Sequence, residues 1–228
     1  MQNPPGFQVP ASIAAADELR AEAEFYCLAE LVIKLRRLRA SRLEGGMQLV
    51  CDRKDAVTLK GQNRAVAIMD IPDPDNFNVT IAFTEETGGF ITVGIIKVLE
   101  ADSLSSELGW AQGWTETTLP DRARLMLPPG RSKTCMMLKC RKGSDADAIV
   151  FGPDNTYLHR KKFTPSFMCS KKDRYLSVVF DRTVHQADAK ATVKFRVRQY
   201  LVHQVTIDCE DEYRPCIFFN GLAEVKVS

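Results

Sequence analysis

The chain has 228 residues, 45% of them hydrophobic and 26% charged, so it is long and apolar enough to fold around a sizeable core. Its 31 basic and 29 acidic residues give a formal net charge of +2, which lacks the basic excess typical of nucleic-acid-binding and membrane-surface proteins. No apolar run approaches the ~20 residues that span a bilayer, and the first residues lack the layout of a secretory signal. We therefore expect neither a nucleic-acid nor a membrane partner.

The N-terminal region is predicted to be extended at first and then helical. Residues 1–12 are rich in proline, whereas residues 14–42 contain neither Gly nor Pro and many strong helix formers. Ser12 is the expected cap, with Asp17 as the alternative, and Gly45-Gly46 is the expected end. One face of this predicted helix is apolar, with leucines at three- and four-residue spacing: Leu28, Leu31, Leu35 and Leu38.

From Met47 onward the pattern is nearly all β. Tyr175–Asp181 is a short apolar run of the kind that fills a sandwich core, and residues 193–198 alternate apolar with basic side chains. Gly88-Gly89 and Asn220-Gly221 are predicted to form two-residue hairpin turns. Many short strands without helical patterns between them predict an antiparallel β-sandwich or barrel. The expected organisation is a helical segment over residues 1–45 and a β-sandwich over residues 46–228.

The β region resembles the SPRY domain, a bent β-sandwich that recognises proteins, over about residues 77–227. The order of its motifs carries the resemblance: Ile91-Thr-Val-Gly-Ile95, Leu108-Gly-Trp-Ala-Gln-Gly-Trp114, Tyr175-Leu-Ser-Val-Val-Phe-Asp181, Val193-Lys-Phe-Arg-Val197 and the closing stretch Tyr213 to Val227. The chain departs from the family at Val197-Arg198-Gln199, where the family usually has Val-Asn-Gly. Because Arg-Gln does not favour the positive φ angles of a type I′ turn, we expect this hairpin to turn differently or further along.

The helical segment resembles the C-terminal end of a BTB domain of the potassium-channel tetramerisation type, over about residues 6–35. The residues that carry this likeness are Asp17-Glu-Leu-Arg-Ala-Glu-Ala-Glu-Phe-Tyr-Cys-Leu-Ala-Glu-Leu-Val32, preceded by Gly6-Phe-Gln-Val-Pro10. The sheet and earlier helices of such a domain do not precede Met1, so we expect an N-terminally shortened fragment. Its helix should fray unless it packs on the sandwich.

Together the two resemblances imply an adaptor. The BTB part would oligomerise and hold a cullin ubiquitin ligase, and the SPRY-like part would select a target by binding a peptide or loop of another protein. A homo-oligomer is then expected only where a full BTB domain is present. Two alternatives stay open: a scaffold that the helix assembles, and a different β fold such as a carbohydrate-binding sandwich, which paired exposed aromatic residues would favour.

The candidate partner-binding residues combine family position with residue type. Tryptophan and arginine are enriched in interface hot spots, although a buried packing role is the alternative for the tryptophans and a solvated loop for the basic segment. The candidates are Trp110, Gln112 and Trp114 in one loop, Tyr157 and Arg160 in a second, and Arg174 beside them.

No motif for catalysis is recognisable. The seven cysteines include no C-x-x-C pair, and the three histidines lie in no metal-binding or catalytic pattern. Cys135 and Cys140 would point to opposite faces of a strand, which argues against a shared metal. We therefore predict no catalytic residue, no metal, no cofactor and no enzymatic activity, in a cytoplasmic protein with the nucleus as the alternative. A thiol enzyme that pairs a cysteine with a histidine through folding is the remaining enzymatic alternative.

Overall fold

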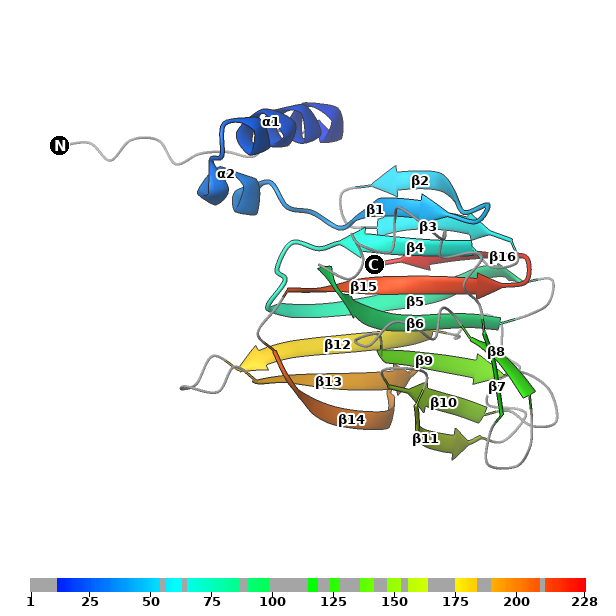
Figure 1. The fold of residues 1–228 in the computed structure, drawn as a ribbon. Helices are drawn as coiled ribbons and strands as arrows, with labels where there is room; N and C mark the ends of the chain where they lie inside the picture. Colours follow the sequence, from blue (N-terminus) through cyan, green and yellow to red (C-terminus); the bar gives the residue numbers. More distant parts are fainter. Residues whose placement is uncertain are drawn as a thin grey trace.

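The protein is an antiparallel β-sandwich with two short helices at one end (Figure 1). The computed structural model describes residues 12–53, 56–62, 65–86, 90–98, 115–118, 124–127, 136–141, 147–152, 156–163, 175–183, 190–209 and 212–228. The predicted fold class, mainly β with an N-terminal helical segment, is confirmed. Within these residues neither helix has the length and hydropathy needed to cross a membrane.

Two seven-stranded sheets form the sandwich. Sheet A has the spatial order β1 (Arg39–Glu44), β4 (Ala65–Asp70), β15 (Tyr213–Asn220), β6 (Phe90–Lys97), β9 (Met136–Arg141), β10 (Asp147–Phe151) and β11 (Tyr157–Lys162). Sheet B has the order β14 (Tyr200–Asp208), β13 (Lys190–Val197), β12 (Tyr175–Thr183), β5 (Asn76–Glu86), β16 (Ala223–Val227), β3 (Ala56–Gly61) and β2 (Gln48–Arg53). A separate pair consists of β7 (Thr115–Thr118) and β8 (Arg124–Leu127).

The core lies between the two sheets and follows the period of two of the strands. In β13 every second residue is buried, as the alternation predicted, and Phe195 is fully inaccessible. Phe180 of β12 stacks on Phe77 of β5, with 5.0 Å between ring centroids. Sheet A contributes Ile217 and Phe219 of β15 to the same core. Each such side chain stabilises the fold by roughly 1.5–3 kcal/mol through burial.

The centre of sheet A is buried on both faces, whereas sheet B has one polar face. All six residues of β4 are buried, although only alternate ones face the core between the sheets. Phe218 and Ile68 lie on the outer face of sheet A and are also inaccessible. Central strands of sheet A such as β4 and β6 therefore read as nearly continuous apolar runs, while strands of sheet B such as β13 alternate.

The long predicted helix over residues 14–42 is wrong. The structure has α1 (Ile13–Phe25) and α2 (Ala29–Lys34), separated by a turn in which Cys27 takes a positive φ of 56°. Ser12 caps α1 as predicted, since its side chain accepts a hydrogen bond from the Ala15 amide at 3.4 Å. Residues 39–44 form β1 because pairing with β4 outweighs their helix propensity.

The residues that were expected to form the end of that helix belong to other elements of the structure. Gly45-Gly46 turns the chain between β1 and β2 with φ values of 65° and 84°. The sandwich thus begins at Arg39, inside the segment 1–45 that was assigned to the helical part. The leucine face is also divided, because Leu28 lies in the turn and is 49% exposed while Leu35 and Leu38 are buried.

Neither predicted glycine hairpin joins neighbouring strands. Gly88-Gly89 itself lies outside the described residues, but β5 and β6 on either side of it belong to different sheets. Asn220-Gly221 likewise connects β15 in sheet A to β16 in sheet B. Turn residues mark where a strand ends but do not determine which strand pairs next, so both positions proved to be crossovers between sheets.

The hairpin at Arg198-Gln199 remains a two-residue turn. Val197 pairs with Tyr200, so the departure from the family pattern does not move the turn along the chain. Arg198, but not Gln199, has a positive φ, which differs from the type I′ geometry with two positive φ angles. The prediction of a different turn type is confirmed.

Candidate functional site

Tyr157 and Arg160 are the two predicted binding residues that the structure describes. Both lie on β11, the last strand of sheet A, so the prediction that they lie in a loop is wrong. Tyr157 pairs with Phe151 and Arg160 with Ile149, two residues of the outer face of sheet A, so the predicted pair shares that face. Tyr157 is 39% exposed, and its ring contacts Phe151 edge-on at 6.5 Å.

The other four predicted binding residues lie outside the described residues. They are Trp110, Gln112, Trp114 and Arg174. Their proximity to β11 stays a prediction.

On its inner side, β11 meets β14, the last strand of sheet B. The Lys161 ammonium group donates a hydrogen bond to the Leu201 carbonyl oxygen at 3.0 Å. The rings of His159 and His203 stack with 5.2 Å between centroids and an interplanar angle of 15°. These contacts close the open side of the sandwich. We call this region the seam and define it by the following residues of the two strands: Tyr157, His159, Arg160, Lys161, Lys162, Tyr200, Leu201 and His203.

The seam is cationic and partly apolar at its surface. Tyr200 and Leu201 are 44% and 43% exposed, and the Lys161 ammonium lies 6.0 Å from the centre of the Tyr200 ring. Among the described residues of the two strands, the carboxylate residue is Asp208 at the far end of β14; on the neighbouring strand, Asp147 pairs with Lys162. Positive charge combined with exposed tyrosine suits an acidic segment that carries some apolar side chains.

The histidine stack has its own electrostatic property. Burial lowers the pKa of His203, and the neighbouring His159 lowers it further. The His203 imidazole is therefore uncharged at neutral pH, which lets the two rings lie in contact without repulsion.

At the opposite end of the sandwich, a network of ion pairs holds the helices. Asp70, at the end of β4, is 6% exposed and accepts from Arg39 at 2.9 Å and from Arg20 of α1 at 3.3 Å. Arg214 of β15 lies 3.4 Å from its other oxygen. Burial alone would raise the pKa of Asp70, but the Arg39 hydrogen bond and the charges of Arg214, Arg20 and Arg39 outweigh burial and keep this pKa below its ordinary value.

A second arginine ties the helical segment to sheet B. Arg37 donates to Asp52 of β2 at 2.7 and 2.9 Å and to Asp17 of α1 at 2.8 Å. The Asp52 hydrogen bond is the largest cause of its raised pKa, so its charge is fixed. We call the Asp70 and Arg37 networks together the joint. Sequence reasoning missed the joint, because it assigned the basic residues after α1 to the end of a helix.

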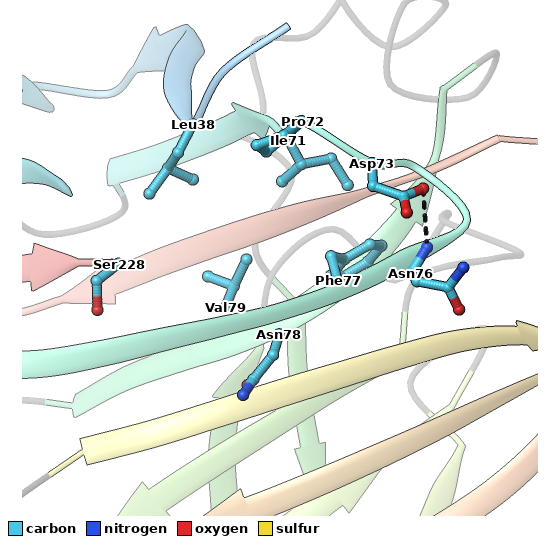
Figure 2. A pocket seen from close by; sticks show the side chains of 9 residues that line it. All are labelled: Leu38, Ile71, Pro72, Asp73, Asn76, Phe77, Asn78, Val79 and Ser228. Atoms are coloured by element: carbon cyan, nitrogen blue, oxygen red, sulfur yellow. Dashed lines mark hydrogen bonds between the residues drawn. The ribbon is translucent and has the colours of Figure 1, made fainter. Parts of the chain in front are cut away.

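A pocket of about 300 Å³ lies beside the joint (Figure 2). Figure 2 shows Leu38 and Ile71 pointing toward Phe77 and Val79 of β5, so its interior is apolar. The rim is polar, and the remaining lining residues are Pro72, Asp73, Asn76, Asn78 and Ser228.

This pocket offers little polar chemistry. Asp73 uses Oδ1 to accept from the Asp75 and Asn76 amides at 2.9 and 3.2 Å, which closes the turn before β5. The volume stands at the lower limit for ligand sites and fits one apolar side chain or a group of similar size. This pocket was not predicted from the sequence.

No constellation for catalysis emerges within the described part of the chain. No group of three or more His, Cys, Asp or Glu residues there could hold a metal ion. Cys209 and Cys216 are buried, Cys51 is half-buried, and Cys27 is exposed.

Comparisons with known proteins give likenesses of fold alone. No family model matches the chain, and no curated protein matches it either. Among solved structures it is similar to a legume lectin-like domain from Entamoeba histolytica, at 12% identity and a TM-score of 0.42 over 87% of this chain and 89% of that one. A Bacillus licheniformis β-glucanase shares 9% identity at a TM-score of 0.40, over 84% and 87% of the two chains. A stonustoxin structure shares 9% sequence identity at a TM-score of 0.48, over 84% of this chain and 28% of the stonustoxin chain. At these values the likenesses assign neither a ligand nor an activity.

Proposed function

We propose that the chain is a non-enzymatic recognition module that binds an extended acidic segment of another protein along the seam. The observation that carries the proposal is the meeting of two end strands, β11 and β14, which brings the basic residues of β11 beside the exposed side chains of Tyr200 and Leu201. An end strand presents backbone N–H and C=O groups to which an extended peptide can add as a further strand. The flanking cations would select an acidic sequence and accelerate its association.

The finer proposal follows from the two resemblances. A SPRY-like sandwich behind the end of a tetramerisation-type BTB domain would be the target-selecting part of an adaptor for a cullin ubiquitin ligase. In that arrangement Trp110, Gln112, Trp114 and Arg174 would extend the binding surface beyond Tyr157 and Arg160. The warrant for this assembly is family architecture, which supports a hypothesis about function but carries no geometry.

The test compares binding of an acidic and a basic probe. A copolymer peptide of Glu and Tyr should bind the protein, and a copolymer of Lys and Tyr should not. The double substitution Arg160→Glu and Lys162→Glu should lower the affinity for the acidic probe by at least about tenfold, which corresponds to ~1.4 kcal/mol. The control is Lys226→Glu on β16, an exposed lysine outside the seam that undergoes the same substitution as Lys162.

Two outcomes would contradict the proposal. Equal binding of the acidic probe by the seam variant and the Lys226 variant would leave only non-specific attraction. Equal binding of the two copolymers by the wild type would remove the charge argument. Alanine at Trp110 and at Arg174 extends the test, and both variants should bind more weakly while their melting temperatures stay close to that of the wild type.

The non-enzymatic part of the proposal has a test of its own. Labelling with a mild alkylator at neutral pH should modify no cysteine faster than a free thiol reacts, because a catalytic thiol is activated by a lowered pKa. A single hyper-reactive cysteine would favour the thiol-enzyme alternative instead.

A further inference from the structure

The turn between α1 and α2 displays the most exposed aromatic side chains of the described chain. Phe25 and Tyr26 are 80% and 67% exposed, and Leu28 is 49% exposed. The two rings contact each other edge to face with 5.1 Å between centroids. Cys27, between Tyr26 and Leu28, takes a positive φ at which the chain turns. We call Phe25, Tyr26 and Leu28 the corner.

The corner is exposed because α1 uses its other face to contact the sandwich. Ala16, Arg20 and Ala23, spaced four and three residues apart, are buried, and Arg20 reaches Asp70 of β4. The joint therefore fixes α1 in an orientation that leaves the corner in solvent. Clustered exposed aromatic residues of this kind usually mark an interface.

Acidic side chains surround the corner. Glu22, Glu24 and Glu30 are all exposed, and of these Glu24 forms an ion pair with Arg20 at 2.8 Å. Lys34, at the end of α2, is the exposed basic residue of the two helices. The corner is thus aromatic and acidic, whereas the seam is aromatic and basic.

We propose that the corner of one copy docks on the seam of a second copy, so that the chain associates head to tail. Phe25 and Tyr26 would pack against Tyr200 and Leu201, and the glutamates beside them would face Arg160 and the lysines of β11. Figure 1 shows the helices at one end of the sandwich and β11 and β14 at the other, so one copy does not satisfy its own two surfaces.

Charge selects this arrangement over a two-fold one. Pairing corner with corner would bring Glu22 and Glu30 of both copies together, and pairing seam with seam would bring lysines and Arg160 together. A contact between two different surfaces does not close on itself unless a ring forms, so association should continue with rising concentration and weaken with salt. The inference goes beyond the proposed recognition of a target and rests on the same seam, for which an acidic peptide would compete.

The experiment uses two complementary variants and measures mass by light scattering after size exclusion. The corner variant carries Phe25→Ser and Tyr26→Ser, and the seam variant carries Arg160→Glu and Lys162→Glu. The wild type should rise in mass through the micromolar range, while each variant alone should stay a monomer. An equimolar mixture should form a dimer and nothing larger, because the one intact corner meets the one intact seam and both remaining ends are blocked.

Several outcomes would overturn head-to-tail association. A wild type that stays monomeric throughout the micromolar range would remove it. A seam variant that still associates would indicate contact between two corners, and a mixture that stays monomeric would show that the two surfaces do not meet. Phe25, Tyr26 and Lys162 are exposed and Arg160 is half-buried, so unchanged circular dichroism checks that the variants remain folded. Association should also be retained in the Lys226→Glu control.

The design separates this inference from the proposed function. The monomeric corner variant keeps an intact seam, so its affinity for the Glu-Tyr copolymer tests target recognition without self-association. If the two variants form a mixed dimer but the corner variant does not bind the peptide, the proposed function is wrong and head-to-tail association stands. If the corner variant binds the peptide but no mixed dimer forms, head-to-tail association is wrong and the proposed function stands.

Discussion

The joint and the seam stand at opposite ends of the same sandwich and use positive charge in opposite ways. In the joint, Asp70 and its arginine partner Arg20 are buried, and each cation has a carboxylate within hydrogen-bond distance. In the seam, Lys161 instead contacts a backbone carbonyl and aromatic rings. Buried ion pairs hold two parts of one chain in place, whereas basic side chains gathered beside exposed aromatic rings at a surface suit an external acidic partner.

The ion pairs of the joint give the helices a defined position. A segment that resembles the end of another domain was expected to fray unless it found the sandwich. The described structure gives it the sandwich as its neighbour, through Arg20 on sheet A and Arg37 on sheet B. The corner is consequently fixed with respect to the seam, as a directional contact between copies requires.

The largest expected effect on stability comes from Asp70→Asn in the joint. This change leaves Arg20, Arg39 and Arg214 around a site that has lost its negative charge. Removing one partner of a buried ion pair typically costs about 3–5 kcal/mol. Urea unfolding should show a loss of that order with an unchanged slope, whereas Asp208→Asn, at the exposed end of β14, should change stability by less than about 0.5 kcal/mol. An equal and small effect of both variants would contradict a structural role for the joint.

The acid limb of the pH profile tests the same group. Because the folded-state pKa of Asp70 is lowered, its contribution is fully present above the unfolded-state pKa of about 4 and is lost as the pH falls below that value. Between neutral pH and strong acid the wild type should therefore lose more stability than Asp70→Asn does. Parallel profiles for the two proteins would show that other carboxylates account for the acid limb.

A smaller and more local effect is expected for Arg37→Met. It removes the charge-assisted hydrogen bonds to Asp17 and Asp52, which together are worth about 1–3 kcal/mol. Amide hydrogen exchange should become faster in α1 while the strands of the core keep their protection. Lys34→Met, on the exposed end of α2, is the control and should leave exchange in α1 unchanged; faster exchange throughout the sandwich would show instead that Arg37 supports the global fold.

Composition and periodicity were sufficient to predict the fold class and many of the strands, but β1 was predicted as helix and Tyr157 and Arg160 of β11 were predicted in a loop. The alternation around Phe195 and the continuous run at Tyr175–Asp181 depend on burial within one strand, which is a local property of the sequence. Which strand pairs with which is not local. Asn220-Gly221 has the composition of a hairpin turn, yet the strands on its two sides belong to different sheets.

The candidate site was predictable in part, for the same reason. Tyr157 and Arg160 could be chosen from residue type and family position, and both lie at a strand edge. The residues that complete the seam, His203 and Leu201, are more than 40 positions away along the chain from His159 and close to it only in the fold. The joint was hidden for a further reason, since Arg37 and Arg39 fit the end of a helix as well as they fit an ion-pair network.

The smallest expected effect is a loss of stability at the seam in mild acid, at a pH where the joint is unchanged. The folded-state pKa of His203 is lowered, so the stability of the seam is complete above the unfolded-state pKa of about 6.5 and decreases as the pH falls through that value. Protonation of His203 would place a positive charge against the His159 ring, and the stack should loosen. The side-chain NMR signals of His203 should therefore shift between neutral pH and pH of about 5, where the carboxylate of Asp70 is still ionised and the joint is intact. In His203→Gln the stability change over this range should be reduced. A change of the same size in wild type and variant would place the titrating group elsewhere.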